Sequence, residues 1–400
     1  MATPNLSTEQ TEFQEHARAW LKANPGPPTD LDLPLSPLEV ATPEQVAYFR
    51  DWQRSCYEAG LVGTDVPKEY GGHGHTSCQH LANREMSRAG VPFLVNTVGL
   101  TMMVPTVLKH GTEEQKRRFI PKALSGEEIW CQGFSEPGAG SDMANQQTMA
   151  ERRGDDWVVN GHKVWTSFGH FAQWMILLAR TSREHKHDGL SFFLCPVEGH
   201  PGVTVKPLVK MTGELGFNEV FLEDAVIDDS LRLDDVGKGW TVAMTVLTSE
   251  RGAAEGAGGG ISSAHPIERL IRLAKDSQRN GRRASDDPLT RDAIVQQAIV
   301  HEGMRQSGRR ARVPALTDHP MRIPLQQKLT GSEFEQSSAR LGVSIAGAHS
   351  MLYKHDDQAP DDGYWPLAYM NSYGLTISGG SNEIQRNILG ERVLGLPKTK

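Results

Sequence analysis

Hydrophobic and polar positions follow three successive patterns along the 400-residue chain. In the first 125 residues apolar side chains recur at helical spacing, as in the row Phe13, Ala17 and Leu21, which predicts helices that bury one face. From about residue 129 the pattern changes to short apolar runs bounded by Gly or Asn, which favours β-strands. From Trp240 helical spacing returns. We therefore predict an α+β protein with an N-terminal α-helical domain (1–125), a middle β-barrel-like domain (126–235) and a C-terminal α-helical bundle (236–400).

Two helix starts carry recognisable signals. Ser7 with Gln10 resembles a capping box, in which each side chain satisfies an amide of the other residue. Thr42 followed by Pro43 places a proline at the first helical position, where its missing N–H costs nothing. The pattern also predicts helices over Leu81–Arg88 and Thr101–His110 and an exposed loop over Lys354–Tyr364.

The small-residue stretch Ala253–Gly260, AAEGAGGG, has two interpretations. Its composition alone favours a flexible linker. The second interpretation depends on the family resemblance described below, which implies a helix of small residues that lets a neighbouring helix or an acyl chain come close, at a cost in helix propensity that packing must offset.

Charge and size exclude several classes of protein. The length favours two or three structural units. The net charge of −7 and the dispersed basic residues argue against nucleic-acid binding. The densest basic run, Arg279–Arg283 with Arg309, Arg310 and Arg312 further on, is interpreted as a solvated face or a contact for small-ligand phosphates.

The four cysteines show no paired spacing, so we expect free thiols and a reducing, cytoplasmic location. No window is apolar enough for a membrane span, and the N-terminus lacks the features of a signal peptide. The cysteines are Cys56, Cys78, Cys131 and Cys195.

The stretch Gln132–Asp142, QGFSEPGAGSD, is the strongest candidate for a ligand-binding loop. Pro137 bars an ordinary helix, and Gly138 and Gly140 permit a ligand to approach the backbone closely. Free backbone N–H groups and serine hydroxyls suit an anion or a carbonyl. Taken alone, a loop of this composition is more often a plain surface turn.

Longer motifs identify a family resemblance. Gln132–Asp142, with WTSF at Trp165–Phe168, resembles the first signature of the acyl-CoA dehydrogenase family. Gly379–Lys398 resembles its second signature, and Asn160–Thr181 resembles its central β-domain. The resemblance implies an FAD enzyme that desaturates an acyl-CoA thioester between the α and β carbons and passes electrons to an electron-transfer flavoprotein. It also implies a homo-oligomer, a dimer or a tetramer.

The resemblance assigns cofactor contacts residue by residue. One group lines the flavin ring and the FAD phosphates, a second lies beside the ring and N5, and a third receives the FAD at a helix start. Trp165 considered alone would more often be a core residue. These groups are, in order, Gln132, Phe134, Ser135 and Ser141; Trp165 and Ser167; and Gly379, Gly380, Ser381 and Glu383.

Glu250 is the candidate base that removes the α proton. Ala243 and Val246 lie at helical spacing from it, which places the carboxylate on an apolar face where burial raises its pKa toward working pH. Many family members carry the base at the position of Gly379, which has no side chain, whereas a smaller set carries it at the position of Glu250. A solvent-facing Glu250 is the alternative. The resemblance places Arg251 and Ser141 at the substrate, and Glu383 ranks as a lesser rival base.

A cluster of His73, His75, Cys78 and His80 offers donor atoms suited to zinc. Its spacing matches none of the usual zinc frames, so no metal site is predicted. The Gly-rich loop lacks the strand and helix context of a dinucleotide fingerprint, so no nicotinamide cofactor is predicted either.

Two departures from the family concern specificity and assembly. No Gln-x-x-Gly-Gly core, which reaches the partner subunit's FAD in the family, is recognisable between Phe334 and Gly374, and Ser277–Arg283 replaces the usual Arg-x-x-Phe pattern. Both resemble a branch from actinobacterial-type lipid, sterol and aromatic catabolism, in which some members are heteromers. We expect a branched, cyclic or bulky acyl group. The alternatives are a non-catalytic or half-site partner subunit, or a flavin oxidase or monooxygenase on the same fold.

Overall fold

The computed structural model describes residues 6–34, 37–253, 266–311, 313–316, 318–319 and 321–398, without the side chains of residues 38, 250–253, 311 and 314. The chain divides into two compact units, residues 1–263 and 264–400, and each is described by itself.

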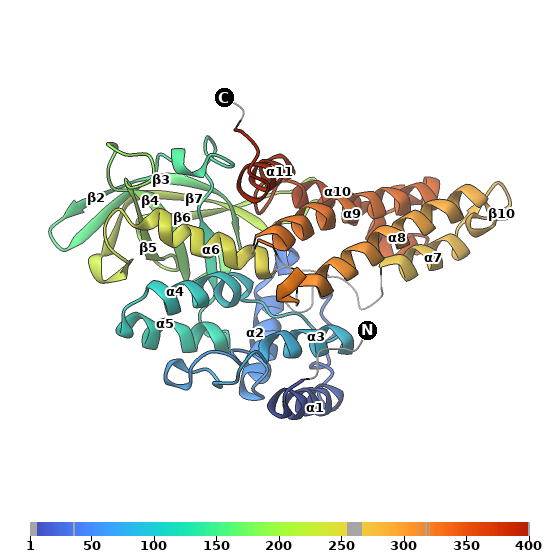
Figure 1. The fold of residues 1–400 in the computed structure, drawn as a ribbon, viewed down its shortest axis with the longest axis horizontal. Helices are drawn as coiled ribbons and strands as arrows, with labels where there is room; N and C mark the ends of the chain where they lie inside the picture. The colour runs from blue at the N-terminus through green and yellow to red at the C-terminus, as the bar shows by residue number, and fades with distance from the viewer. Residues whose placement is uncertain are drawn as a thin grey trace. The chain divides into compact units, whose positions relative to one another are not determined.

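Helices form the first part of the first unit (Figure 1). Ser7 and Gln10 exchange hydrogen bonds at the start of α1, and Thr42 and Gln45 do the same at the start of α2, so both predicted starts are confirmed. The helix expected over Thr101–His110 begins as a π-helical turn, η3, and continues as α4. The elements are α1 (Thr8–Ala23), α2 (Pro43–Glu58), α3 (Gln79–Ala89), η3 (Gly99–Met103), α4 (Val104–His110) and α5 (Glu113–Ser125).

The predicted β-domain is a mixed eight-stranded sheet that does not close into a barrel. Its order is β6-β7-β3-β2-β4-β5-β8, and β1 pairs with β4 in parallel. The two longest strands, β3 and β7, pair antiparallel and carry two register irregularities. The strands are β1 (Trp130–Gly133), β2 (Met149–Arg153), β3 (Asp156–Ser167), β4 (Trp174–Arg180), β5 (Leu190–Pro196), β6 (Val203–Leu208), β7 (Phe217–Asp228) and β8 (Arg232–Leu233).

Strand β4 is buried on both faces, which explains its uninterrupted apolar sequence. Successive side chains of a strand point to opposite faces. Ile176 and Leu178 therefore join the core under the N-terminal helices, whereas Met175 and Leu177 join a second core on the other face of the sheet. The sheet separates two hydrophobic cores, and the described helices α1 to α6 of the first unit contribute residues to only one of them.

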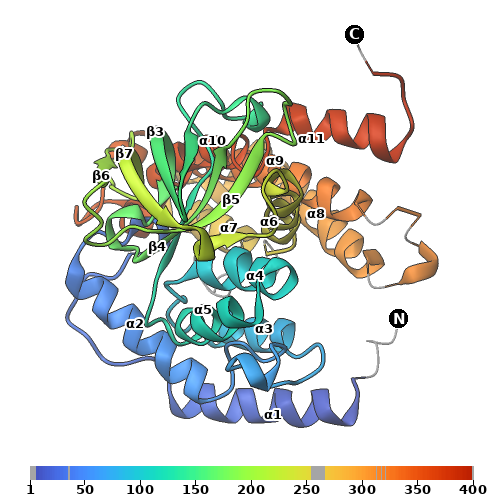
Figure 2. The ribbon, with the colours of Figure 1, turned by 90° about the vertical axis from the view of Figure 1, so that its left-hand side faces the viewer.

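Helix α6 (Gly239–Ala253) lies beside α4 and packs against the face of the sheet that the N-terminal helices cover (Figure 2). Its residues Val242, Ala243 and Val246 are fully buried in that core. His110 at the end of α4 joins Asp234 (3.0 Å from Nδ1) to Thr245 of α6 (2.8 Å from Nε2). This chain of hydrogen bonds fixes α6 laterally. Of the stretch Ala253–Gly260, only Ala253 is described, as the last residue of α6, so neither interpretation of that stretch is tested.

The second unit is helical, as the sequence predicts for this part of the chain, but it begins at residue 264, and α6 packs in the core of the first unit. Its core contains Leu270, Phe334 and Trp365, and Trp365 lies directly over Gly342, where an added Cβ would come within 1.9 Å of the indole. The helices are α7 (Pro266–Asp276), α8 (Pro288–Ala311), α9 (Arg322–Ala346), α10 (Tyr364–Leu375) and α11 (Asn382–Ile388). The expected loop before α10 consists of turns and a 3-10 turn, Pro360–Gly363.

A small hairpin in this unit was not predicted. Strands β9 (Gln278–Arg279) and β10 (Arg282–Arg283) pair antiparallel around Asn280 and Gly281, whose φ angles are 51° and 75°. Two left-handed residues form the tight turn that Asn-Gly favours in hairpins. The arginines of this basic run are exposed, as a solvated face requires.

All four cysteine thiols are free and buried, as expected. Among the described helices, none combines the length and the apolar character required to cross a membrane.

Candidate functional site

The candidate loop leaves β1 and folds back onto β3. The carbonyl of Ser135 accepts a hydrogen bond from the Val164 amide at 2.9 Å, and Glu136 and Ala139 exchange backbone hydrogen bonds across a tight turn. Phe134 is buried, Gln132 and Ser135 are half-buried, and Ser141 is exposed. The loop residues expected at a cofactor therefore lie next to the strand that carries Trp165 and Ser167.

Trp165 is exposed and lies on a strained backbone. Its side chain is 61% exposed, its φ is 61°, and it lies within an irregularity of the β3–β7 pairing. Left-handed conformation costs a bulky residue about 1 to 3 kcal/mol, and such strain persists mainly where function requires it. The ring contacts Phe217 edge-on at 5.9 Å between centroids. The exposure excludes the alternative that Trp165 is a core residue.

A fully buried lysine holds the loop to the sheet. Lys163, two residues before Trp165, extends its ammonium to Oε1 of Glu136 at 2.9 Å and to the carbonyl of Phe134 at 3.2 Å. It also donates to the side-chain oxygen of Gln146. All three acceptors belong to the candidate loop or its return to β2.

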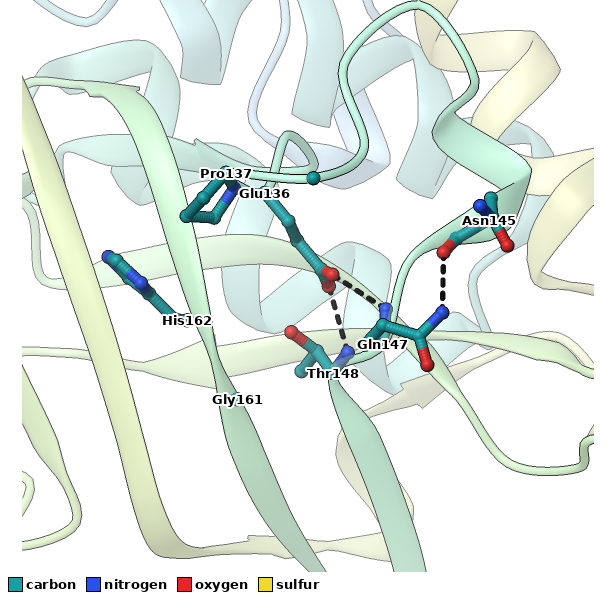
Figure 3. Close-up of a pocket in the computed structure, with 8 residues that line it drawn as sticks. Glu136, Pro137, Asn145, Gln147, Thr148, Gly161 and His162 are labelled. Atoms are coloured by element: carbon teal, nitrogen blue, oxygen red, sulfur yellow. Dashed lines mark hydrogen bonds between the residues drawn. The ribbon is translucent and has the colours of Figure 1, made fainter.

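The partner carboxylate is equally well satisfied. Glu136 accepts from the Gln147 amide at 2.6 Å and from the Thr148 amide at 2.9 Å, as Figure 3 shows. Glu136 and Thr148 also line an open depression of about 350 Å³. The carboxylate therefore joins the two ends of the loop, and it lies within the predicted stretch, although sequence reasoning gave it no role.

Burial and charge pairing oppose each other at this ion pair. Burial lowers the pKa of the Lys163 ammonium to about 8, although the nearby Glu136 carboxylate partly offsets this effect. Burial also raises the pKa of Glu136, but Lys163 and the two amides outweigh it and leave that pKa below its usual value. Both groups are therefore charged at neutral pH.

The second candidate segment is the turn at the start of α11, in the other unit. Gly379 and Gly380 have φ angles of 63° and 86°, and the Ser381 hydroxyl caps α11 by accepting from the Ile384 amide. Lys328 of α9 donates to the carbonyl of Gly380 at 2.7 Å and to Oδ1 of Asn382 at 2.9 Å. A lysine thus also holds this turn.

The comparisons with known proteins decide the family. The model of the acyl-CoA dehydrogenase N-terminal domain matches residues 7–127, that of the middle domain matches residues 131–225, and that of the C-terminal domain matches residues 237–394. The chain belongs to the acyl-CoA dehydrogenase family. Members of this family are FAD-dependent oxidoreductases.

Curated and solved acyl-CoA dehydrogenases resemble the chain over most of its length. Acyl-CoA dehydrogenase IpdE1 of Mycobacterium tuberculosis is 39% identical over 87% of this chain and 88% of its own, and IpdE1 of Mycolicibacterium smegmatis is 40% identical over the same shares. The structure titled Tcur3481-Tcur3483 steroid ACAD matches with a TM-score of 0.79 at 27% identity, covering 100% of both chains. The ChsE4-ChsE5 complex from Mycobacterium tuberculosis matches with a TM-score of 0.77 at 25% identity, also over 100% of both chains. These matches confirm the predicted family and fold class.

The two candidate bases of this acyl-CoA dehydrogenase differ in what the structure describes. The side chains of Glu250 and Arg251 lie outside the described residues, but their backbone continues α6. Val246 and Ala243, which precede Glu250 by four and seven residues, are both fully buried. Glu383 is exposed, and its own amide and the Ser381 hydroxyl lower its pKa, which makes it a weaker proton acceptor.

The histidine-rich loop divides between separate contacts. His73 bonds the Tyr57 carbonyl at 3.0 Å. His75 lies instead beside Cys78 and Glu9, whose candidate donor atoms are all within 4.8 Å of one another. His75 Nδ1 bonds Glu9 at 3.0 Å, and burial raises the pKa of the Cys78 thiol, so the observed contacts are those of a hydrogen-bonded loop on α1.

Proposed function

We propose that this chain is an FAD-dependent acyl-CoA dehydrogenase that desaturates a bulky, ring-bearing acyl-CoA between its α and β carbons. The observation that carries the flavin assignment is the exposed Trp165 on a left-handed backbone beside the anchored loop. An aromatic face of this size held out to solvent at an energetic cost needs a partner, and a flat heteroaromatic ring matches it.

The residues of the first unit fit a flavin. The hydroxyl-bearing residues Ser135 and Ser167 lie on either side of the Trp165 bulge, and both are half-buried, so they can meet a ligand without full desolvation. An added Cβ at Gly138 or Gly140 would meet nothing within 4 Å, so the loop tip has open space for a ligand. Gln132, Phe134 and Ser141 complete this set. Gly379, Gly380, Ser381 and Glu383 form the separate set at the start of α11.

Glu250 is proposed to take the α proton. A base on α6 lies on a helix whose preceding turns are buried and which His110 and Asp234 hold in place. A rigid helix under the base favours the fixed geometry that proton transfer requires. Bound FAD would accept the β hydrogen as a hydride. Arg251 and Ser141 are proposed to contact the acyl-CoA.

The substrate class is proposed from the relatives. A solved relative at 27% identity is titled a steroid ACAD, and it covers the whole chain. A polycyclic acyl group needs a wide pocket, and the sequence after Ala253 is rich in Gly and Ala, the smallest residues. We therefore propose ring-bearing acyl-CoA thioesters ahead of straight-chain ones, with an electron-transfer flavoprotein as the acceptor.

The test is anaerobic mixing of the purified chain with straight, branched and ring-bearing acyl-CoAs while flavin absorbance is followed. We expect the ring-bearing class to bleach the flavin fastest. Glu250→Gln should keep yellow FAD and bind acyl-CoA but lose bleaching, whereas Glu383→Gln should disturb FAD retention more than chemistry. Near-wild-type bleaching by Glu250→Gln would sink the assignment of the base, and rapid reoxidation by oxygen would favour an oxidase.

A second candidate is a half-site subunit of a heteromer. Solved relatives of this chain are titled as two-component assemblies, Tcur3481-Tcur3483 and ChsE4-ChsE5. The missing Gln-x-x-Gly-Gly core between Phe334 and Gly374 favours the same interpretation. A colourless chain that becomes yellow and active only with a second acyl-CoA dehydrogenase chain would establish it; a yellow homo-oligomer that bleaches alone would exclude it.

A further inference from the structure

The buried ion pair of Lys163 and Glu136 joins the candidate loop to strand β3 and lies outside the chemistry assigned so far. Lys163 has no exposed surface and Glu136 is 7% exposed. A buried pair repays its desolvation only when the geometry is good and further hydrogen bonds satisfy the remaining atoms. Here the ammonium has three acceptors and the carboxylate has two amide donors besides the lysine.

The contacts of the pair reach both the candidate loop and the strand that carries Trp165. Through Phe134 and Gln146 the ammonium fixes the start and the end of the loop. Along its own strand, Val164 bonds Ser135, and Trp165 follows at once in the left-handed conformation. A displacement of Lys163 would therefore move the loop and the strained tryptophan together.

We propose that Lys163 is a positioning residue for the flavin: with Glu136 it sets the shape of residues 134–148 and holds Trp165 in the conformation that meets the ring. The inference rests on the proposed function. It assigns no contact between Lys163 and the cofactor, because the ammonium is fully enclosed by protein atoms and acts through the loop.

Three variants separate positioning from simple stability. Lys163→Met keeps the apolar stem but leaves the Glu136 carboxylate buried without its cation. Glu136→Gln keeps the size of the side chain and one acceptor oxygen. The double variant, Lys163→Met with Glu136→Gln, removes both charges and therefore leaves no buried charge without a partner. It still lacks the ammonium that binds Phe134 and Gln146. The matched control is Lys186→Met, which breaks an exposed ion pair to Asp142 of the same loop (2.9 Å).

The readouts are the rate of FAD release, the visible circular dichroism of the bound flavin and the thermal midpoint of the apoprotein. We expect Lys163→Met to release FAD roughly ten- to a hundredfold faster, with a changed flavin spectrum, because the displaced loop and tryptophan would lose contacts with the cofactor, and each tenfold corresponds to about 1.4 kcal/mol. The double variant should recover the thermal midpoint but not FAD retention, and Lys186→Met should match the wild type in all three readouts.

Either of two results would overturn the role of Lys163: wild-type FAD release by folded Lys163→Met, or recovery of both stability and FAD retention in the double variant. If Lys163→Met and the double variant both fail to fold, Glu136→Gln decides by the same readouts. Faster FAD release by this variant supports the role of the pair, and wild-type release contradicts it. A wild-type chain that takes up no FAD would instead overturn the proposed function itself.

Discussion

Two segments expected at the cofactor, one in each unit, are held by a lysine in different ways. Lys163 is fully buried and pairs with a carboxylate, whereas Lys328 is half-buried, and the bonds that fix the turn run to the neutral oxygens of Gly380 and Asn382. An ammonium near solvent tolerates neutral acceptors, but one enclosed by protein needs a counter-charge. The comparison indicates that an anchor enclosed by protein depends on its counter-charge, whereas a half-buried anchor keeps part of its hydration.

The backbones of the two segments also differ. Both contain left-handed residues, but the turn before α11 uses glycine twice, at Gly379 and Gly380, whereas β3 uses Trp165. Glycine adopts this conformation freely, and a bulky residue does not. The turn is therefore relaxed, while the strand retains strain to present an aromatic ring.

The largest expected effect is that of Glu136→Ala. The substitution strands the buried Lys163 ammonium and two amide N–H groups, so the free energy of unfolding should fall by about 3 to 5 kcal/mol. Urea unfolding followed by far-UV circular dichroism measures it. A loss below about 1 kcal/mol would show that the pair behaves like an exposed one.

The same pair should also make the free energy of unfolding depend on pH, with a smaller effect. Burial holds the pKa of Lys163 at about 8 in the folded state, below its usual value of 10.5, so between these values the unfolded state binds more protons. The contribution of Lys163 to the free energy of unfolding should therefore rise with pH across this window. Subtracting the curve of Lys163→Met from that of the wild type isolates it; a difference that falls with pH would contradict the lowered pKa.

In the second unit Lys328→Met should cost less than Glu136→Ala. It removes charge-assisted hydrogen bonds from a half-buried ammonium to Gly380 and Asn382, so a loss of about 1.5 to 3 kcal/mol is expected. Urea unfolding of both variants ranks them directly. If Lys328→Met were the more damaging, burial would not be the property that separates the two anchors.

The sequence predicts the fold better than it predicts these anchors. Helical spacing, capping boxes and short apolar runs report local structure, so the three regions and the helix starts follow from neighbouring residues. The Lys163–Glu136 pair joins residues 27 positions apart, and only the folded loop brings them together. The left-handed φ of Trp165 is likewise set by tertiary structure, because nothing in the local sequence requires it.

Of two other features that the sequence analysis missed, one has a signal in the sequence and one does not. Asn280-Gly281 is a recognised hairpin dipeptide, so the β9–β10 turn could have been predicted from the sequence. The grouping of Glu9 with His75 and Cys78 could not, because Glu9 lies on α1, 66 positions from His75, which lies in a loop. Cofactor residues are recognisable by motif, whereas the residues that position them depend on contacts across the fold.

Relief of strain predicts a modest gain for Trp165→Gly. Glycine accepts the φ of 61° without steric strain, and the indole that is removed is exposed and makes an edge contact with Phe217, so the apoprotein should gain up to about 1 kcal/mol. FAD should nevertheless dissociate faster. Thermal unfolding of the apoprotein and FAD release measure the two effects, and a destabilised apoprotein would show that Trp165 stabilises the fold.

The smallest effect should come from Lys186→Met, which removes the exposed pair with Asp142 on the same loop. Both side chains are more than half exposed (54% and 58%), so water and salt screen their attraction. The expected loss in free energy of unfolding is below about 1 kcal/mol and should shrink further in high salt. That result would mean that the buried pair, and not the exposed one, holds the loop in shape. A loss comparable with that of Glu136→Ala would instead mean that surface charge holds the loop, and the contrast drawn from burial would not stand.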